Sequence, residues 1–156
     1  DKNVEKKAIK SMKALNRKPA ELMDGLPVHA CTDVTGFGLL GHACEMIEGS
    51  DVGMRIFASK VPVFAEALEY ARMGLIPGGA YRNQEYRASM VDIEHGIDEE
   101  LVKVLFDPQT SGGLLIVLPD AEAGRLLSLL HAEGIREAAI VGEITPAHAG
   151  RIKVGF

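Results

Sequence analysis

The sequence of 156 residues contains no tryptophan, only two cysteines and no long hydrophobic run. Cys31 and Cys44 cannot by themselves build a disulfide framework or a four-thiolate metal site, so we expect a reducing, cytoplasmic environment. Crossing a bilayer requires about 20 consecutive apolar residues. No stretch of the sequence approaches that length, and we therefore expect no membrane partner.

Basic residues are also scarce. Lysine and arginine together number 17, against 22 aspartates and glutamates, which gives a formal net charge of −5. Binding along a nucleic-acid backbone depends on clustered lysine and arginine, so nucleic acid is not an expected partner. What the chain does have is a hydrophobic content of 47%. A chain of this length can bury roughly 70% of its unfolded surface, and we predict a single domain over residues 1–156.

The first residues indicate a longer polypeptide. The sequence begins at Asp1 without an initiator methionine and enters at once a helical pattern in which Val4, Ala8, Met12 and Leu15 share one face. We therefore expect this chain to be part of something larger.

Helix and strand patterns alternate along the chain. Periodicity predicts helices over residues 3–24 with a break near Pro19, 39–48, 63–73, 98–105 and 121–133, and strands over 28–34, 51–58, 114–118, 138–144 and 151–154. This alternation predicts an α/β (α+β) fold in which helices pack on a mixed β-sheet. Residues 74–97 show no sustained period. We expect them to form a long irregular segment with a role in function or in contacting another part of the protein.

A glycine-rich turn follows the first predicted strand. Residues 36–41 fit the pattern G-x-G-x-x-G and open a predicted helix, as a dinucleotide-binding site requires. Such a site also needs an acidic residue about 20 positions later to hold the ribose. That region is the apolar and basic segment 60–63. An NAD-binding oxidoreductase domain is therefore an alternative that this sequence disfavours.

An acidic residue precedes the same turn. The carboxylate of Asp33 would repel a bound phosphate unless Mg²⁺ lay between them, and Mg²⁺ is commonly held by one or two carboxylates together with phosphate oxygens. The helix that opens near Gly38 would add N–H donors. We predict a Mg-phosphate site with Asp33 as metal ligand and Thr32, Thr35, Gly36 and Gly38 beside the phosphate. The alternative is that Asp33 or Thr35 caps the helix and the glycines only form a turn.

A second loop, residues 107–113, has one acid, two hydroxyls and paired glycines before an apolar strand. It either approaches a ligand closely or makes a turn into the strand, and Asp107 could touch a metal, a nucleotide or its own backbone. Ser111 has no neighbouring base and is not expected to be a nucleophile.

Several further polar residues could have either a structural or a functional role. We expect His42 to be a core or helix-surface histidine, and Cys31 to be a small buried cysteine without a catalytic role. Arg82 and Asn83 contact either phosphate, a partner domain or only solvent. No histidine pair has the spacing of a zinc site.

Four segments together resemble a known family. Residues 32–42 (TDVTGFGLLGH), 76–83, 107–115 (DPQTSGGLL) and 139–144 resemble, in order and content, the C-terminal half of selenophosphate synthetase (selenide, water dikinase), a two-domain enzyme of the AIR-synthetase-like superfamily. The resemblance extends over residues 4–154. It implies the fold of an AIR synthetase C-terminal domain.

The resemblance also implies a reaction. It predicts ATP-dependent phosphorylation of selenide to selenophosphate with release of AMP and phosphate, assisted by Mg²⁺ and K⁺, and it assigns the role of magnesium ligand to Asp33. The catalytic Cys or Sec of the family belongs to the N-terminal half, so we expect no catalytic residue here and an inactive isolated fragment. The expected partners are the missing N-terminal domain, ATP, selenide and, for the full-length protein, a second copy in a homodimer. A non-catalytic interaction module that has kept the fold is a further alternative.

Overall fold

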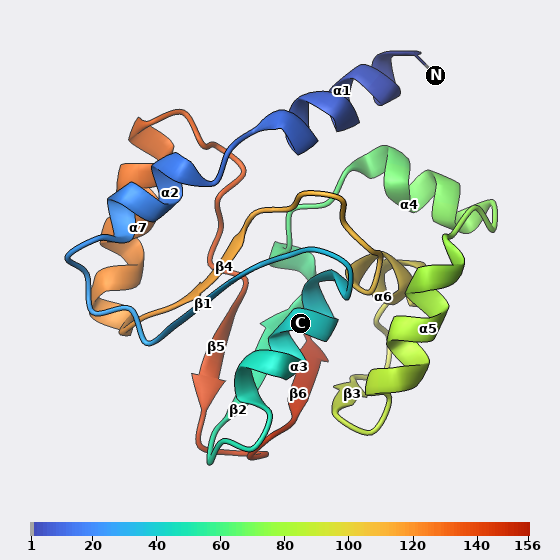
Figure 1. Cartoon of the computed structure of the whole chain (residues 1–156). Helices are drawn as coiled ribbons and strands as arrows, with labels where there is room; N and C mark the ends of the chain where they lie inside the picture. The colour runs from blue at the N-terminus through green and yellow to red at the C-terminus, as the bar shows by residue number, and fades with distance from the viewer. Residues whose placement is uncertain (1) are drawn as a thin grey trace.

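The computed structural model describes residues 2–156. Seven helices and six strands follow one another in these residues: α1 (Lys2–Lys13), α2 (Arg17–Met23), β1 (Ala30–Asp33), α3 (Gly38–Ile47), β2 (Gly53–Phe57), α4 (Ala65–Arg72), α5 (Gly78–Arg87), β3 (Val91–Ile93), α6 (Glu99–Leu105), β4 (Leu114–Val117), α7 (Asp120–Ala132), β5 (Gly142–Thr145) and β6 (Ile152–Gly155), with one 3₁₀ turn, η1 (Ala58–Lys60), after β2. Figure 1 shows the helices arranged around the strands, which confirms the predicted α/β class.

The strands form two sheets. The mixed sheet has the order β3-β6-β2-β5, in which β6 is parallel to both β2 and β3, and β5 is antiparallel to β2. Strands β1 and β4 form a separate antiparallel ribbon, in which Asp33 lies opposite Leu114 and Ala30 opposite Val117. Asp33 is therefore at the end of the ribbon and outside the mixed sheet.

Helix α3 joins the two sheets. It contacts both β1 and β2, and its side chains Leu40 and Ile47 are buried together with Ile56 of β2 and Ile152 of β6. Removing a side chain such as Leu40 from water contributes about 1.5–3 kcal/mol to folding. Because α3 starts directly after the glycine-rich turn, this core fixes the position of that turn.

The long N-terminal helix is divided. The break falls at residues 14–16, before Pro19, which lies in the first turn of α2. A proline ring inside a helix clashes with the carbonyl four residues earlier, whereas it is tolerated in the first turn, so the helix restarts just ahead of Pro19. The side chain of Asn16, at the break, donates to the carbonyl of Gly112 at 2.9 Å.

Helix α1 stands apart from the rest of the molecule (Figure 1). None of its residues is buried. Lys7 links it to α4, through an ion pair with Glu66 at 2.8 Å and a position 4.6 Å from the centre of the Phe64 ring. No helix in residues 2–156 is both long enough and apolar enough to cross a membrane.

The prediction of an irregular segment over 74–97 is wrong. Residues 78–87 form α5 and residues 91–93 form β3. The buried residues of α5 are Ala80, Asn83 and Arg87, which have helical spacing but are mostly polar. A search for periodic apolar residues therefore could not detect this helix. The strand predicted over 138–144 is also shifted, because β5 covers residues 142–145. The carbonyl of Ala138 is bonded at 2.9 Å to the ring of His131, which lies in α7 and not in a neighbouring strand.

Candidate functional site

The two glycine-containing loops lie side by side and continue the β1–β4 ribbon. The amide of Val34 donates to the carbonyl of Gly113 at 2.9 Å, and the amide of Gly112 donates back to Val34 at 3.0 Å. One step further, the amide of Gln109 donates to the carbonyl of Thr35 at 3.0 Å. Two motifs that are far apart in the sequence therefore form one structural unit, with Asp33 at its edge.

Two glycines make this close approach possible. Gly38 has φ = +69°, and a Cβ there would lie 2.6 Å from the carbonyl carbon of Phe106. A Cβ on Gly112 would lie 2.3 Å from the carbonyl oxygen of Val34. By contrast, a Cβ on Gly36 would meet no atom within 4 Å. Gly38 and Gly112 therefore serve contact between the loops, whereas the predicted phosphate-side residue Gly36 is open.

The amides at the start of α3 are engaged inside the chain. The N–H of Gly38 donates to the carbonyl of Thr35 at 3.0 Å, and that of Phe37 donates to Nε2 of His42 at 3.4 Å. Phe37 is the residue that caps α3, without a side-chain cap hydrogen bond. The N–H groups of Phe37 and Gly38 are therefore already used, and the alternative in which Asp33 or Thr35 caps the helix is not observed.

His42 is buried, as predicted for a core histidine, and both of its ring nitrogens have partners. Its Nε2 lies 3.1 Å from the hydroxyl of Thr35, and its Nδ1 lies 2.8 Å from a carboxylate oxygen of Glu45. Since Nε2 also accepts from Phe37, the tautomer that satisfies all three contacts carries the proton on Nδ1. His42 therefore positions Thr35 through its Nε2 contact.

Asp33 is exposed at the end of β1. Its carboxylate makes no ion pair within residues 2–156. Successive side chains of a strand point to opposite faces, so Thr32 faces away from Asp33. The hydroxyl of Thr32 donates to the backbone carbonyl of Asp33 at 3.2 Å. The structure thus leaves Asp33 available to a cation, but does not place Thr32 beside it.

Cys31 is exposed, so the prediction of a buried cysteine is wrong, because the two-stranded ribbon leaves this face of β1 uncovered. Partial burial of the thiol, together with the neighbouring Asp33 carboxylate, raises its pKa. A raised pKa disfavours the thiolate, which is the reactive form of a cysteine.

Asp107 is a residue whose role the sequence left open. Its Oδ2 accepts a hydrogen bond from the side-chain amide of Gln109 at 2.8 Å, while its Oδ1 is buried without a partner. Burial raises the pKa of Asp107, and the hydrogen bond from Gln109 acts in the opposite direction. A buried carboxylate oxygen without a donor is unfavourable for folding, and a nearby cation would relieve that cost.

We expect Asp107→Asn to stabilise the fold at neutral pH. A carboxyl group whose pKa is raised in the folded state disfavours folding when it is ionised, and this cost disappears as the pH falls from the raised pKa to the ordinary value of about 3.9. The melting temperature of the variant should therefore exceed that of the wild type at pH 7–8 without Mg²⁺, and the two should converge near pH 4. Thermal unfolding over this pH range measures the difference, and a variant less stable at every pH would contradict the prediction.

Two further polar residues near the site come from α5. Asn83 is buried, and its Nδ2 donates to the carbonyls of Gly36 and Phe106, both at 3.0 Å. Arg87, also buried, donates to Glu48, the residue that follows α3, at 3.0 Å. Arg82 of the same helix is exposed. Of the three predicted alternatives, exposure to solvent describes Arg82, and none includes the contacts that Asn83 makes within the chain.

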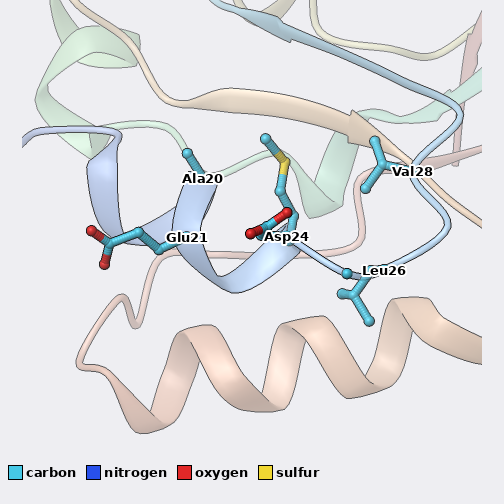
Figure 2. A pocket seen from close by; sticks show the side chains of 7 residues that line it. Ala20, Glu21, Asp24, Leu26 and Val28 are labelled. Atoms are coloured by element: carbon cyan, nitrogen blue, oxygen red, sulfur yellow. The ribbon is translucent and has the colours of Figure 1, made fainter.

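A separate groove lies away from this site. It is a shallow hollow of about 490 Å³ beside the turn from α2 to β1, lined by Ala20, Glu21, Met23, Asp24, Gly25, Leu26 and Val28. Figure 2 shows that the side chain of Leu26 points towards a neighbouring helix and that Glu21 points out of the groove. None of the predicted site residues lines it.

Comparison with known proteins decides the family. The sequence profile described as "AIR synthase related protein, C-terminal domain" matches residues 1–155. The chain belongs to this family. Among the curated relatives of this AIR synthase related domain, "Selenide, water dikinase" of Pelobacter propionicus is 51% identical over 95% of the chain and 42% of its own length. "Selenide, water dikinase 2" of Peptoclostridium acidaminophilum is 44% identical over 92% of the chain and 41% of its own length.

The AIR synthase related domain spans about two fifths of the length of these relatives. Among solved structures, the "Crystal Structure of Hydrogenase Maturation Protein HypE" superposes with a TM-score of 0.58 at 19% identity, over 91% of the chain and 39% of that protein. At this level of identity the likeness concerns the fold. The likeness agrees with a fold in which helices pack on a mixed sheet.

Proposed function

We propose that this chain is the C-terminal domain of a selenophosphate synthetase, which phosphorylates selenide at the expense of ATP and releases AMP and phosphate. The observation that carries the proposal is the exposed carboxylate of Asp33, without an ion pair in residues 2–156, in a domain that is 51% identical to a protein named "Selenide, water dikinase". The remaining domain of the same polypeptide, ATP and selenide are the proposed partners, in a cytoplasmic homodimer.

The residues present fit a magnesium ion at the ATP phosphates. Residues 2–156 contain no group of three or more acidic, histidine or cysteine side chains that could hold a metal alone. Mg²⁺ does not require such a group, since it is commonly bound by one or two carboxylates, phosphate oxygens and water. Asp33 would hold the ion, and the partnerless Oδ1 of Asp107 lies on the adjoining loop. When bound, Mg²⁺ supplies positive charge that offsets the negative charge of the phosphates.

The other predicted residues differ in how directly they would contribute to phosphate binding. Gly36 is open and would let a phosphate approach the backbone, while Thr35 is held in place by its hydrogen bond to His42. Gly38 would act indirectly, by keeping its loop against Phe106, and Thr32 would contribute least because it faces away from Asp33. K⁺ would be a further cation of the complete enzyme.

No residue of this domain is proposed to act as a nucleophile or as a general base. Phosphoryl transfer depends mainly on positioning and on neutralisation of charge, and one carboxylate with its supporting loops provides only part of that. The Cys or Sec of the complete enzyme would come from the other domain. We therefore propose that the isolated domain is inactive.

The test compares the full-length polypeptide with the isolated domain. Both are incubated with ATP, selenide and Mg²⁺, and selenophosphate, AMP and phosphate are measured by ³¹P NMR. We expect the full-length polypeptide to form all three only when selenide and Mg²⁺ are present, and the isolated domain to form none. If the full-length polypeptide yields no selenophosphate, the proposed function is wrong. If it binds neither ATP nor Mg²⁺, the alternative of a non-catalytic interaction module is favoured instead. Magnesium-dependent turnover by the isolated domain would refute the proposed division of labour.

A further inference from the structure

One side chain holds both loops of the site. Asn83 is only 8% exposed, and its amide nitrogen lies 3.0 Å from the carbonyl oxygen of Gly36 and 3.0 Å from that of Phe106. A side-chain amide has two N–H donors, so one donor serves each loop. Gly36 lies three residues after Asp33 in the first loop. Phe106 is the residue just before Asp107, with which the second loop begins.

The backbone segments around Asn83 are closely packed. The first loop meets Phe106 at Gly38, where a Cβ would collide with the backbone. The first turn of α5 meets the second loop at Gly79, where a Cβ would lie 2.6 Å from Cγ of Pro108. Two carbonyl oxygens are thus held close to one nitrogen, and each would lose a donor if the Asn83 amide were removed. Leaving such groups without a partner is unfavourable in a buried place.

A second, longer path runs from α5 to the same loop. Arg87 lies 3.9 Å from a carboxylate oxygen of Glu45, Glu45 is bonded to His42, and His42 is bonded to Thr35. This path reaches the first loop only. Asn83 differs from it because its two contacts are direct and connect both loops.

We propose that Asn83 is a positioning residue that fixes the loop carrying Asp33 relative to the loop carrying Asp107, and so sets the geometry in which Mg²⁺ and the ATP phosphates are held. This inference rests on the proposed function. Asn83 itself touches neither metal nor phosphate. Its loss should therefore leave the ligands present but allow the loops to move apart, which weakens the binding of Mg-ATP and slows the chemical step.

The test uses the full-length polypeptide with Asn83→Ala and Asn83→Asp. Small displacements of catalytic geometry can cost up to about a hundredfold in rate, and we expect Asn83→Ala to lower kcat/KM for Mg-ATP by about tenfold or more. The half-saturating Mg²⁺ concentration should rise as well. Asn83→Asp has no donor when ionised, but regains one when protonated, so its rate relative to wild type should increase as the pH is lowered.

A matched control separates positioning from general loss of stability. Asp98 caps α6 by accepting from the amide of Glu100 at 2.9 Å and pairs with Arg72 at 3.0 Å, and neither of these partners lies in the two loops. Asp98→Ala should lower the melting temperature, yet leave the half-saturating Mg²⁺ concentration within about twofold of the wild type. Hydrogen exchange of peptides covering residues 107–113 should accelerate in Asn83→Ala and not in Asp98→Ala.

The outcomes are distinguishable. Two results with an active wild type would overturn the positioning role and leave the proposed function intact. In the first, the Asn83 variants keep the wild-type half-saturating Mg²⁺ concentration. In the second, they lose activity only in proportion to their melting temperature, as Asp98→Ala does. A wild type that makes no selenophosphate would overturn the proposed function, and the inference with it. Faster exchange at 107–113 together with a higher half-saturating Mg²⁺ concentration in Asn83→Ala would support the inference.

Discussion

Asp33→Asn in the full-length polypeptide is expected to lower the magnesium-dependent rate of selenophosphate formation by about a hundredfold or more, the scale seen when a preorganised electrostatic group is removed from an active site. An amide carries no charge and is a weaker ligand for Mg²⁺ than a carboxylate. The exposed Asp33 side chain makes no ion pair in the part of the chain that the structure describes. The melting temperature should therefore hardly change.

The measurement is the initial rate of AMP and selenophosphate formation as a function of Mg²⁺ concentration, together with thermal unfolding. Asp51→Asn is the matched control, because Asp51 is also exposed but lies in the turn between α3 and β2. The control should retain the wild-type rate. A normal rate with normal Mg²⁺ dependence in Asp33→Asn would exclude Asp33 as the metal ligand.

Gly38→Ala is expected to destabilise the domain by about 3 kcal/mol or more. An L-residue at a positive φ costs about 1–2 kcal/mol, and the added methyl would lie 2.6 Å from the backbone of Phe106, so the two loops would have to separate. Overpacking of this kind adds about 1–3 kcal/mol. Urea-induced unfolding of wild type and variant measures the difference in the free energy of unfolding.

The control for this change lies two residues earlier. Gly36 is not at a positive φ, and a Cβ there would meet open space. Gly36→Ala should therefore change the free energy of unfolding by less than about 1 kcal/mol. Equal losses for the two variants would show that the contact between Gly38 and Phe106 does not determine the stability of the loop.

Most of the elements could be predicted from the sequence because their buried faces are apolar. Leu40 and Ile47 mark α3 by helical spacing, and both are buried in the structure. Helix α5 escaped prediction for the opposite reason: its buried face contains Asn83 and Arg87, whose burial is permitted by hydrogen bonds to groups on other elements. Such partners cannot be identified before the fold is known.

The candidate site was predicted only in part. Asp33 could be singled out because a carboxylate before a glycine-rich turn has a specific electrostatic meaning. The pairing of Val34 with Gly112 and Gly113 depends on the antiparallel register of β1 and β4, which no local pattern encodes. The buried Oδ1 of Asp107 and the double contact of Asn83 follow from that pairing, so they too became visible only in three dimensions.

The backbone ladder between the two loops also restricts how this region can vary in length. Val34 is bonded to both Gly112 and Gly113, and Thr35 is bonded to Gln109, so that only Thr110 and Ser111 lie between the bonded positions of the second loop. Inserting or deleting a residue at Val34, or at Gly112 and Gly113, would shift the register of β1 against β4 and turn side chains to the opposite face of the ribbon. Exposed side chains can therefore be exchanged here, but insertions and deletions should be confined to positions outside the bonded residues, such as 110 and 111.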